Sequence, residues 1–383
     1  MAGDVHTSTH PPLPPTTEED RLARLRLLRS RRVGIATYHR LLAECGTAAA
    51  ALEELPALAR AAGLERYSPC SPADAEAELR DGRRAKAQLV FLGEPAYPAA
   101  LAALADAPPL LWVHGQSALL ARPMVAVVGA RNASSLGTRM ARRLAIDLGA
   151  AGYVVASGLA RGVDTAAHHG ALTSGTAAVL AGGIDVIYPP ENAGLARDIA
   201  AQGVLLSEQR PGLQPQARHF PARNRLVSGL ARAVVVVEAA ARSGTLITAR
   251  TALDQGREVL AVPGHPLDGR AAGCCSLIRD GATLVRSADD ILEVIGPAAP
   301  EAPRQPDLPL VAPDPPPPAV RPAATMAELH RRILEKLGPS PLAEDQLIRD
   351  LAVTATALAP ALTELELDGA VTRQPGGLLS RSH

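Results

Sequence analysis

Residues 233–262 read AVVVVEAAARSGTLITARTALDQGREVLAV. This stretch begins with an apolar run, passes through a polar loop at 242–245, continues with a helical pattern and ends in a second apolar run at 258–262. Neither run alternates with polar residues, which is typical of strands buried on both faces of a parallel sheet. Gly256 precedes the second run, at the position after a helix that favours glycine. The stretch therefore predicts a strand, a helix and a parallel strand.

Similar apolar runs flank this unit on both sides and alternate with helical patterns. Such alternation, from Met124 to about Ile295, predicts a doubly wound α/β domain with a mostly parallel sheet. The runs are VAVV (125–128), YVVA (153–156), AAVLA (177–181), VLLS (204–207), AVVVVEA (233–239), EVLAV (258–262) and TLV (283–285). Left-handed glycines are predicted to end the helices at Gly152, Gly175, Gly203, Gly256 and Gly281.

Four regions of different composition flank this domain, which we place at 120–296. Residues 1–17 are rich in Pro, Thr and His and predict a disordered start. Residues 18–84 form short amphipathic helical stretches separated by glycines, which predicts a small helical module. Such a module either contacts nucleic acid or protein, or only packs. Residues 297–323 are rich in proline and predict an extended tether.

Residues 326–380 predict a winged helix-turn-helix, because three helical patterns precede a hairpin. The helices are expected at about 327–337, 342–350 and 354–368, and the hairpin turn at Gly376–Gly377. The third helix carries Glu364, Glu366 and Asp368 and neither Lys nor Arg. A helix that reads DNA is normally basic, so we expect this helix to contact protein instead.

Composition limits the class of protein. The 383 residues include 39 Lys and Arg and 39 Asp and Glu, so the chain is not a uniformly basic nucleic-acid binder. Residues 125–290 nevertheless carry 17 Lys and Arg against 13 Asp and Glu. The four cysteines form no C-x-x-C pair, which is typical of reduced thiols in the cytosol. Neither a membrane span nor a signal peptide is evident, and we expect a cytoplasmic protein without a membrane partner.

Residues 218–225 read RHFPARNR and combine a flat ring with three guanidinium groups. Phe220 is one of only two Phe residues in the chain, so its place among arginines is informative. A binding site for an unpaired nucleic-acid strand needs such a set. Arg218, Arg223 and Arg225 would bind phosphates, and the ring would stack a base, which contributes about 1–3 kcal/mol. Alternatively, Phe220 is a buried anchor and the arginines form a solvated helix face.

Three loops that follow apolar runs combine Ser, Gly and Arg: GARNASSLG (129–137), SGLARGVDTAAHHGAL (157–172) and RSGTLITA (242–249). The carboxyl ends of parallel strands meet at one sheet edge, where ligands bind. The first loop lacks the G-x-G-x-x-G spacing and the later acidic residue of a dinucleotide site. Converging amides and arginines fit several phosphates in a row better than one small substrate. The candidate residues in these loops are Gly129, Arg131, Ser134, Ser157, Gly158, Arg161, Gly162, Ser243, Gly244 and Thr245.

Asp164 and His168 stand four residues apart on the helix expected after the second loop, where they could pair. As a catalytic acid/base or metal pair they lack a third ligand at metal-site spacing. A capping Asp and a packed His explain them as well. We predict neither a metal nor a cofactor.

Seven strings resemble, in order, the signature of the DNA-processing protein A (DprA, also called Smf) family. The resemblance spans about 120–290, and looser likeness extends to an N-terminal SAM-like helical module and a C-terminal winged-helix module. The strings are VVGARNASSLG, SGLARGVDTAAHHGAL, GGIDVIYPPEN, GVLLSE, FPARNRLVSGL, VVVVEAAARSGTLITARTALDQGREVLAVPG and GCCSLIRDGA.

The resemblance implies a Rossmann-like domain that binds single-stranded DNA and catalyses no reaction. It also implies a homodimer formed through that domain, which protects incoming DNA and loads RecA recombinase onto it during natural transformation. The residues that match the family motifs are Gly129, Arg131, Ser157, Gly158, Arg161, Phe220, Arg223, Asn224, Arg225, Ser243, Gly244 and Thr245.

The chain departs from the family pattern at four places. Leu136 stands where Tyr is usual, Gln209 replaces the Tyr of an SEY motif, and Cys275 replaces an Asn. The lysine usual just before the FP pair is absent, and Arg218 is the nearest cation.

Two other functions fit the same fold class. One is a nucleotide-processing enzyme like the lysine-decarboxylase-like phosphoribohydrolases, which use a PGGxGT loop followed by a catalytic Glu. Here the corresponding loop is AARSGTLITA, without a Glu in the next turn. The other is a regulatory or scaffold protein that acts through the winged helix.

Overall fold

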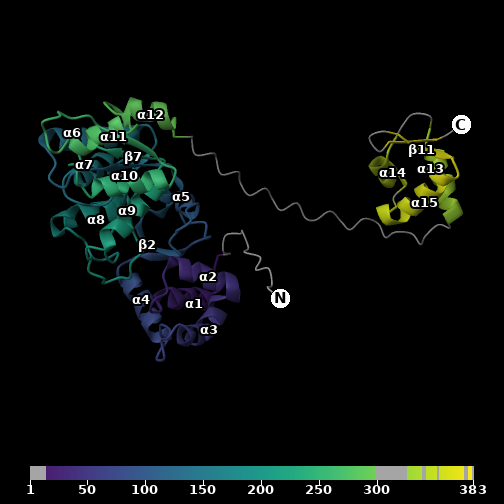
Figure 1. Ribbon diagram of the computed structural model, residues 1–383, viewed down its shortest axis with the longest axis horizontal. Helices are drawn as coiled ribbons and strands as arrows, with labels where there is room; N and C mark the ends of the chain where they lie inside the picture. The colour runs from purple at the N-terminus through teal and green to yellow at the C-terminus, as the bar shows by residue number, and fades with distance from the viewer. Residues whose placement is uncertain (1–13, 299–325, 339–341, 352, 375–377, 382–383) are drawn as a thin grey trace. The chain divides into compact units, whose positions relative to one another are not determined.

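A nine-stranded sheet forms the centre of the first of two compact units, residues 1–302 (Figure 1). The computed structural model describes residues 14–298, 326–338, 342–351, 353–374 and 378–381. The strand order is β1-β2-β6-β5-β4-β3-β7-β8-β9. The strands are β1 Gln88–Phe91, β2 Leu110–Gly115, β3 Met124–Val128, β4 Val154–Ser157, β5 Thr176–Val179, β6 Val204–Ser207, β7 Ala233–Val236, β8 Glu258–Ala261 and β9 Thr283–Leu284.

The strands from β3 to β9 pair only in parallel with one another, which confirms the seven predicted runs and the doubly wound fold. β4 lies on one side of β3 and β7 on the other, so the chain reverses its direction of progress across the sheet at β3. Such a switch point leaves a crevice at the carboxyl ends of the strands. The three Ser/Gly/Arg loops follow β3, β4 and β7, and therefore meet there.

Helices cover both faces of the sheet because alternate residues of each buried strand point to opposite sides. Ala126 of β3 faces a layer of α5, α9, α10 and α11, whereas Val125 and Val127 face α6, α7 and α12. The helices are α5 Ala99–Ala102, α6 Ser135–Ala150, α7 Val163–Ala171, α8 Ala193–Gln202, α9 His219–Leu230, α10 Thr245–Asp254, α11 Ala272–Arg279 and α12 Ala288–Ile295.

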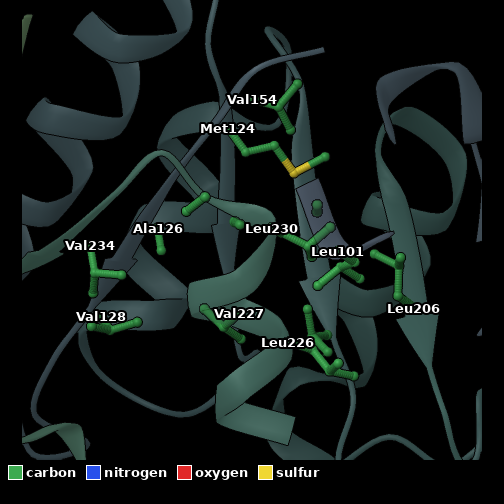
Figure 2. Close-up of a cluster of buried hydrophobic side chains, with 14 of the residues drawn as sticks. Leu101, Met124, Ala126, Val128, Val154, Leu206, Leu226, Val227, Leu230 and Val234 are labelled. Carbon is green, nitrogen blue, oxygen red and sulfur yellow. The ribbon is translucent and has the colours of Figure 1, made fainter. Parts of the chain in front are cut away.

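Helix α9 carries most of RHFPARNR, and its second half packs into the hydrophobic core. Figure 2 shows Leu226, Val227 and Leu230 packed among strand residues such as Val128 and Val234. These three leucine and valine side chains are almost fully buried. The first turn of α9 is thereby fixed at the edge of the sheet where the loops meet.

β1 and β2 were not predicted from the sequence. They pair antiparallel with each other, and β2 pairs antiparallel with β6, so they extend one end of the sheet. Their runs, QLVF and LLWVHG, lie outside the strand–helix alternation that marked the other strands. A short apolar run without that context is ambiguous between strand and helix.

The predicted N-terminal helical module consists of four helices, α1 Glu18–Arg29, α2 Ile35–Cys45, α3 Ala48–Ala61 and α4 Pro72–Arg84. The guanidinium of Arg29 donates to both carboxylate oxygens of Glu78, at 2.8–3.1 Å. The indole Nε1 of Trp112 in β2 donates to the same carboxylate at 3.2 Å. Trp112 is 1% exposed. One carboxylate thus links two helices of the module to the sheet.

Gly82→Ala is expected to lower the free energy of unfolding by about 1–2 kcal/mol. A Cβ at Gly82 would lie 2.1 Å from the buried ring of Trp112, and overpacking of this kind costs about 1–3 kcal/mol. The higher helix propensity of Ala, about 1 kcal/mol, offsets part of that cost. Denaturant unfolding followed by the fluorescence of Trp112, the only Trp in the chain, measures the change. Gly34→Ala is the control, because no atom lies within 4 Å of its added Cβ.

Four of the five glycines predicted to end helices have positive φ angles. Gly203 does not, and its prediction was wrong: its φ is −128°. A Cβ there would lie 2.5 Å from the carbonyl oxygen of Thr176 in β5. Close packing of the chain against the sheet, and not a left-handed turn, requires this glycine.

The second unit, residues 303–383, has the predicted winged-helix order of elements. Its elements are α13 Met326–Lys336, β10 Leu342–Ala343, α14 Glu344–Leu351, α15 Ala355–Leu367, β11 Val371–Gln374 and β12 Leu378–Arg381. The predicted second helix begins two residues late, because 342–343 form a short strand paired with β12. The turn at Gly376–Gly377 and most of the predicted segments 1–17 and 297–323 lie outside the described residues.

Candidate functional site

A cavity of about 760 Å³ lies where the loops after β3, β4 and β7 meet the first turns of α9 and α10. We call it the loop cavity. The predicted residues that line it are Gly129, Arg131, Gly158, Phe220, Arg223, Asn224, Ser243, Gly244 and Thr245. The predicted convergence of the three loops and RHFPARNR on one place is thus present in the structure.

Positive charge dominates the lining of the loop cavity. Four arginines line it, Arg131, Arg223, Arg242 and Arg270. Asp164 supplies the single carboxylate among the described lining residues. A cavity with this balance attracts anions, and its low-dielectric walls strengthen the field.

The ring of Phe220 is partly exposed and lines the cavity. The guanidinium carbon of Arg131 lies over this ring, 5.2 Å from its centre. The ring of Tyr188 meets it edge-on, with 5.6 Å between ring centres. Phe220 is therefore a fixed, half-covered platform, and not the buried anchor that the sequence also allowed.

Arg223 forms the floor of the cavity and is 6% exposed. Its Nη1 donates to the carbonyl oxygen of Val179 at 3.0 Å, while its buried Nε has no hydrogen-bond partner among the described residues. A Cβ at position 158 would lie 1.6 Å from Nη1, so Gly158 makes room for the guanidinium. Burial lowers the pKa of Arg223, and the nearby Asp164 acts in the opposite direction.

Asp164 shapes the loop after β4 and does not pair with His168. Its Oδ2 accepts hydrogen bonds from the amides of Gly158 and Ala160, at 3.1 and 3.3 Å. Asn192 supports the same loop by donating to the carbonyl oxygen of Leu159, whose φ of 56° is unusual for leucine. Burial raises the pKa of Asp164, which the charge of Arg223 counteracts.

His168 is fully buried and bonds to Thr176 instead of Asp164. The Thr176 hydroxyl donates to the carbonyl oxygen of Val155, so its oxygen accepts from Nδ1 of His168 at 2.7 Å. The two side chains leave α7 toward different partners, so the structure agrees with the alternative of a capping Asp and a packed His. Among the described residues, no group of three His, Cys, Asp or Glu side chains is placed to hold a metal ion.

The SGT segment offers a smaller anion cradle than predicted. The amide of Ser243 donates to the carbonyl of Ala240, and that of Thr245 to the Ser243 hydroxyl. The Thr245 hydroxyl donates to the carbonyl oxygen of Gly129 at 3.1 Å, which ties two of the loops together. These groups therefore stabilise the loops, and the arginines carry most of the capacity to bind anions.

Six predicted residues do not line the loop cavity. Ser157 is fully buried and donates to the carbonyl oxygen of Val127 at 2.7 Å. Ser134 caps α6, and Gly162 has a φ of 76° that keeps its chain close to Ala130. Arg225 is partly buried and forms ion pairs with Glu208 and Asp106. Exposed Arg161 lies 3.7 Å from Glu191, and exposed Arg218 donates to His219.

Several residues that line the cavity were missed. Arg242 precedes the SGT segment directly, so its position in that loop was a usable signal. Arg270 lies in the segment after β8, and only the tertiary structure brings it to the cavity. Arg161 and Tyr188 line a small recess that shares Arg131, Phe220 and Arg223 with it.

Three family models match this chain. The model described as DNA recombination-mediator protein A matches residues 88–296. The DprA-like N-terminal HHH domain matches residues 18–80, and the DprA winged helix domain matches residues 314–377. The helices of the described residues include none long and apolar enough to cross a membrane.

Known proteins resemble the chain over much of its length. The DNA processing protein DprA of Streptococcus pneumoniae is 48% identical over 198 residues, which are 51% of this chain and 70% of that protein. Its X-ray structure has a TM-score of 0.58 and covers 71% of this chain. The protein Smf of Synechocystis is 33% identical over 322 residues, 78% of this chain and 81% of that protein.

A solved structure of DNA processing protein A from Helicobacter pylori, described as having a unique single-stranded DNA binding mode, is 30% identical. It has a TM-score of 0.51, covers 55% of this chain, and is itself covered to 97%. The sheet order, the helical and winged-helix modules and these matches agree. The chain belongs to the family of DNA recombination-mediator protein A, the DprA/Smf proteins.

Proposed function

We propose that this protein binds single-stranded DNA in the loop cavity. The observation that carries the proposal is the pairing of four arginines with the partly exposed Phe220 ring in one cavity. Guanidinium groups bind phosphates, and a ring stacks any unpaired base, which is the general design of single-strand binding sites. The Helicobacter pylori relative, whose described property is single-stranded DNA binding, supports the same function here.

We further infer that the bound strand is protected and passed to a recombinase of the RecA type, during natural transformation or recombination. The description of the matching family model as a recombination mediator supports this step. The protein acts in the cytoplasm as a homodimer through its Rossmann-like domain, and the acidic helix α15 serves protein contacts.

No chemical step is part of this proposal. Among the described residues that line the cavity, Asp164 is the one carboxylate; it is buried and already accepts hydrogen bonds from two loop amides. The alternative, a phosphoribohydrolase, needs a glutamate in the turn after the SGT segment, where this chain has Leu246, Ile247 and Thr248. The binding function therefore fits the residues better than nucleotide hydrolysis.

Arg131→Ala is expected to lower the salt dependence of single-strand binding. Each phosphate contact on a single strand contributes about 0.7 to the slope of log K against log salt concentration, so the slope should fall by about that amount. Anisotropy titrations with a labelled dT oligonucleotide at several ionic strengths measure it, and a duplex of equal length tests the preference for unpaired bases.

Arg84→Ala is the matched control. This side chain is 82% exposed at the end of α4, away from the loop cavity, and its loss should leave the slope unchanged. If Arg131→Ala and the unaltered protein give the same slope and affinity, the strand does not run through this cavity.

A further inference from the structure

A second cavity, of about 580 Å³, opens beside the loop cavity. It lies between the first turns of α6, residues 237–238 after β7, and the segment 263–271 after β8. We call it the Glu238 cavity. Its volume is within the range of small-molecule sites. None of the residues predicted to bind DNA lines it except the helix cap Ser134.

Glu238 lines this cavity with a carboxylate that is held in place. One oxygen accepts from the amide of Ser134 at 2.9 Å, and the other accepts from the Ser134 hydroxyl. Gly137 leaves room for it, because a Cβ there would lie 2.4 Å from the carboxylate carbon. Each oxygen of a carboxylate has two lone pairs, so each retains one beyond its contact with Ser134. Because Ser134 donates to both oxygens, the remaining lone pairs point away from each other, and a ligand donates to one oxygen or the other.

The position of Glu238 excludes a phosphate from this part of the cavity. It lies against the first turn of α6, where other doubly wound folds bind the phosphates of a nucleotide. The chain's own anion occupies that position, so a second anion there would be repelled. The carboxylate instead accepts hydrogen bonds from a ligand that carries N–H groups.

Apolar and basic side chains also line the Glu238 cavity. Leu136, 70% exposed, and Met140 supply apolar walls with Pro263. Arg139 and His265 also line the cavity, and neither forms an ion pair with a described residue. Glu238 would repel an acidic peptide, and Arg139 would repel a basic peptide. A nucleotide fits both, because its base carries donors and its phosphate is anionic.

The two cavities share two segments of chain. In the loop after β3, Arg131 and Asn132 line the loop cavity and Ser134 lines the Glu238 cavity. In the segment after β8, Arg270 lines the first and Asp268 the second. A strand held in the loop cavity therefore has a short path into the Glu238 cavity.

We propose that the Glu238 cavity holds a further base of the bound strand and favours guanine. Guanine presents N1–H and N2–H side by side, and both can donate to one of the carboxylate oxygens. Thymine presents one N–H between two carbonyl oxygens, which the carboxylate repels. A pair of hydrogen bonds of this kind discriminates between bases by about 5- to 150-fold. This inference rests on the proposed binding of single-stranded DNA.

The test compares two labelled oligonucleotides, one of dT alone and one of equal length with two isolated dG residues. The unaltered protein is expected to bind the second at least about fivefold more tightly. Glu238→Gln removes the negative charge and replaces one acceptor oxygen by an N–H donor, and should abolish the preference. Competition with free dGMP and dTMP gives a second measure of it.

Met140→Trp tests the cavity without altering Glu238 or Ser134, because the larger side chain fills the space. Ile146→Trp is its control, since Ile146 lies on the same helix, is 45% exposed and does not line the cavity. Met140→Trp should lose the preference for dG and keep its affinity for dT, whereas Ile146→Trp should retain both.

The outcomes separate this inference from the proposed function. If the unaltered protein binds both oligonucleotides equally, or if Met140→Trp and Glu238→Gln both retain the preference, the Glu238 cavity does not hold a base. Binding to dT would then still stand. If neither oligonucleotide binds, the proposed function fails and takes this inference with it.

Discussion

Phe220→Ala weakens the binding of a dT oligonucleotide by about 5- to 150-fold, the equivalent of about 1–3 kcal/mol for one stacked base. This is the largest effect that we expect in the loop cavity. The side chain lines the cavity, and its ring is already fixed by Arg131 and Tyr188. A fixed ring loses little entropy when a base stacks on it, so its removal should cost most of the stacking energy.

The salt dependence of DNA binding distinguishes the contribution of base stacking from that of phosphate contacts. Phe220→Ala removes no cation, so the slope of log K against log salt concentration should stay as it is, in contrast to Arg131→Ala. Phe220→Tyr keeps the ring and should keep the affinity, whereas Phe220→Leu keeps only the apolar bulk and should not. Equal affinity for Phe220→Ala and the unaltered protein would mean that the ring serves packing alone.

Acid is expected to destabilise the first unit through His168. Burial, with a smaller contribution from the charge of Arg223, lowers the pKa of this imidazole from 6.5 to about 3. Below pH 6.5 the unfolded chain therefore binds a proton that the folded chain does not, and stability falls as the pH falls toward 3. Between pH 7 and pH 5 the loss from this group is about 2 kcal/mol.

The hydrogen bonds of His168 explain why the folded chain excludes the proton. Nδ1 already donates to Thr176, and the buried Nε2 has no partner among the described residues. A proton on Nε2 would add a buried charge and a donor without an acceptor, both of which are costly. The neutral ring is the form that fits.

The measurement compares the unaltered protein with His168→Leu by denaturant unfolding at pH 5 and pH 7, followed by the fluorescence of Trp112. Burial raises the pKa values of Asp164 and Glu208, which makes the folded protein more stable as the pH falls, so the difference between the two proteins isolates His168. His169→Leu, at an exposed neighbouring position, is the control. A pH dependence that is identical in all three proteins would contradict the expectation.

The arginines of RHFPARNR show where sequence reasoning reached its limit. At 100° per residue, Arg223 lies on nearly the same face of α9 as Phe220, three residues earlier, whereas Arg225 lies on the opposite face. Arg223 accordingly joins Phe220 at the loop cavity, and Arg225 pairs with Glu208 and Asp106. The helical period could have predicted this division, but composition alone could not.

Local sequence determined the seven parallel strands from β3 to β9 and the edge at which the loops meet. Uninterrupted apolar runs such as 125–128 and 233–239 can be satisfied only by burial on both faces, and the parallel arrangement then brings the following loops together. The N-terminal and C-terminal modules followed from the same kind of periodicity. These features depend on residues close to one another in the chain.

Tertiary structure alone decided which polar side chains remain available to a ligand. Ser157 bonds to Val127, 30 residues away, and Arg225 bonds to the carbonyl of Asp106, 119 residues away. A hydroxyl or guanidinium binds whichever acceptor the fold brings within about 3 Å, and short-range patterns do not specify that acceptor. For the same reason Arg270 and the Glu238 cavity became visible only when the loops after β3, β7 and β8 were seen together.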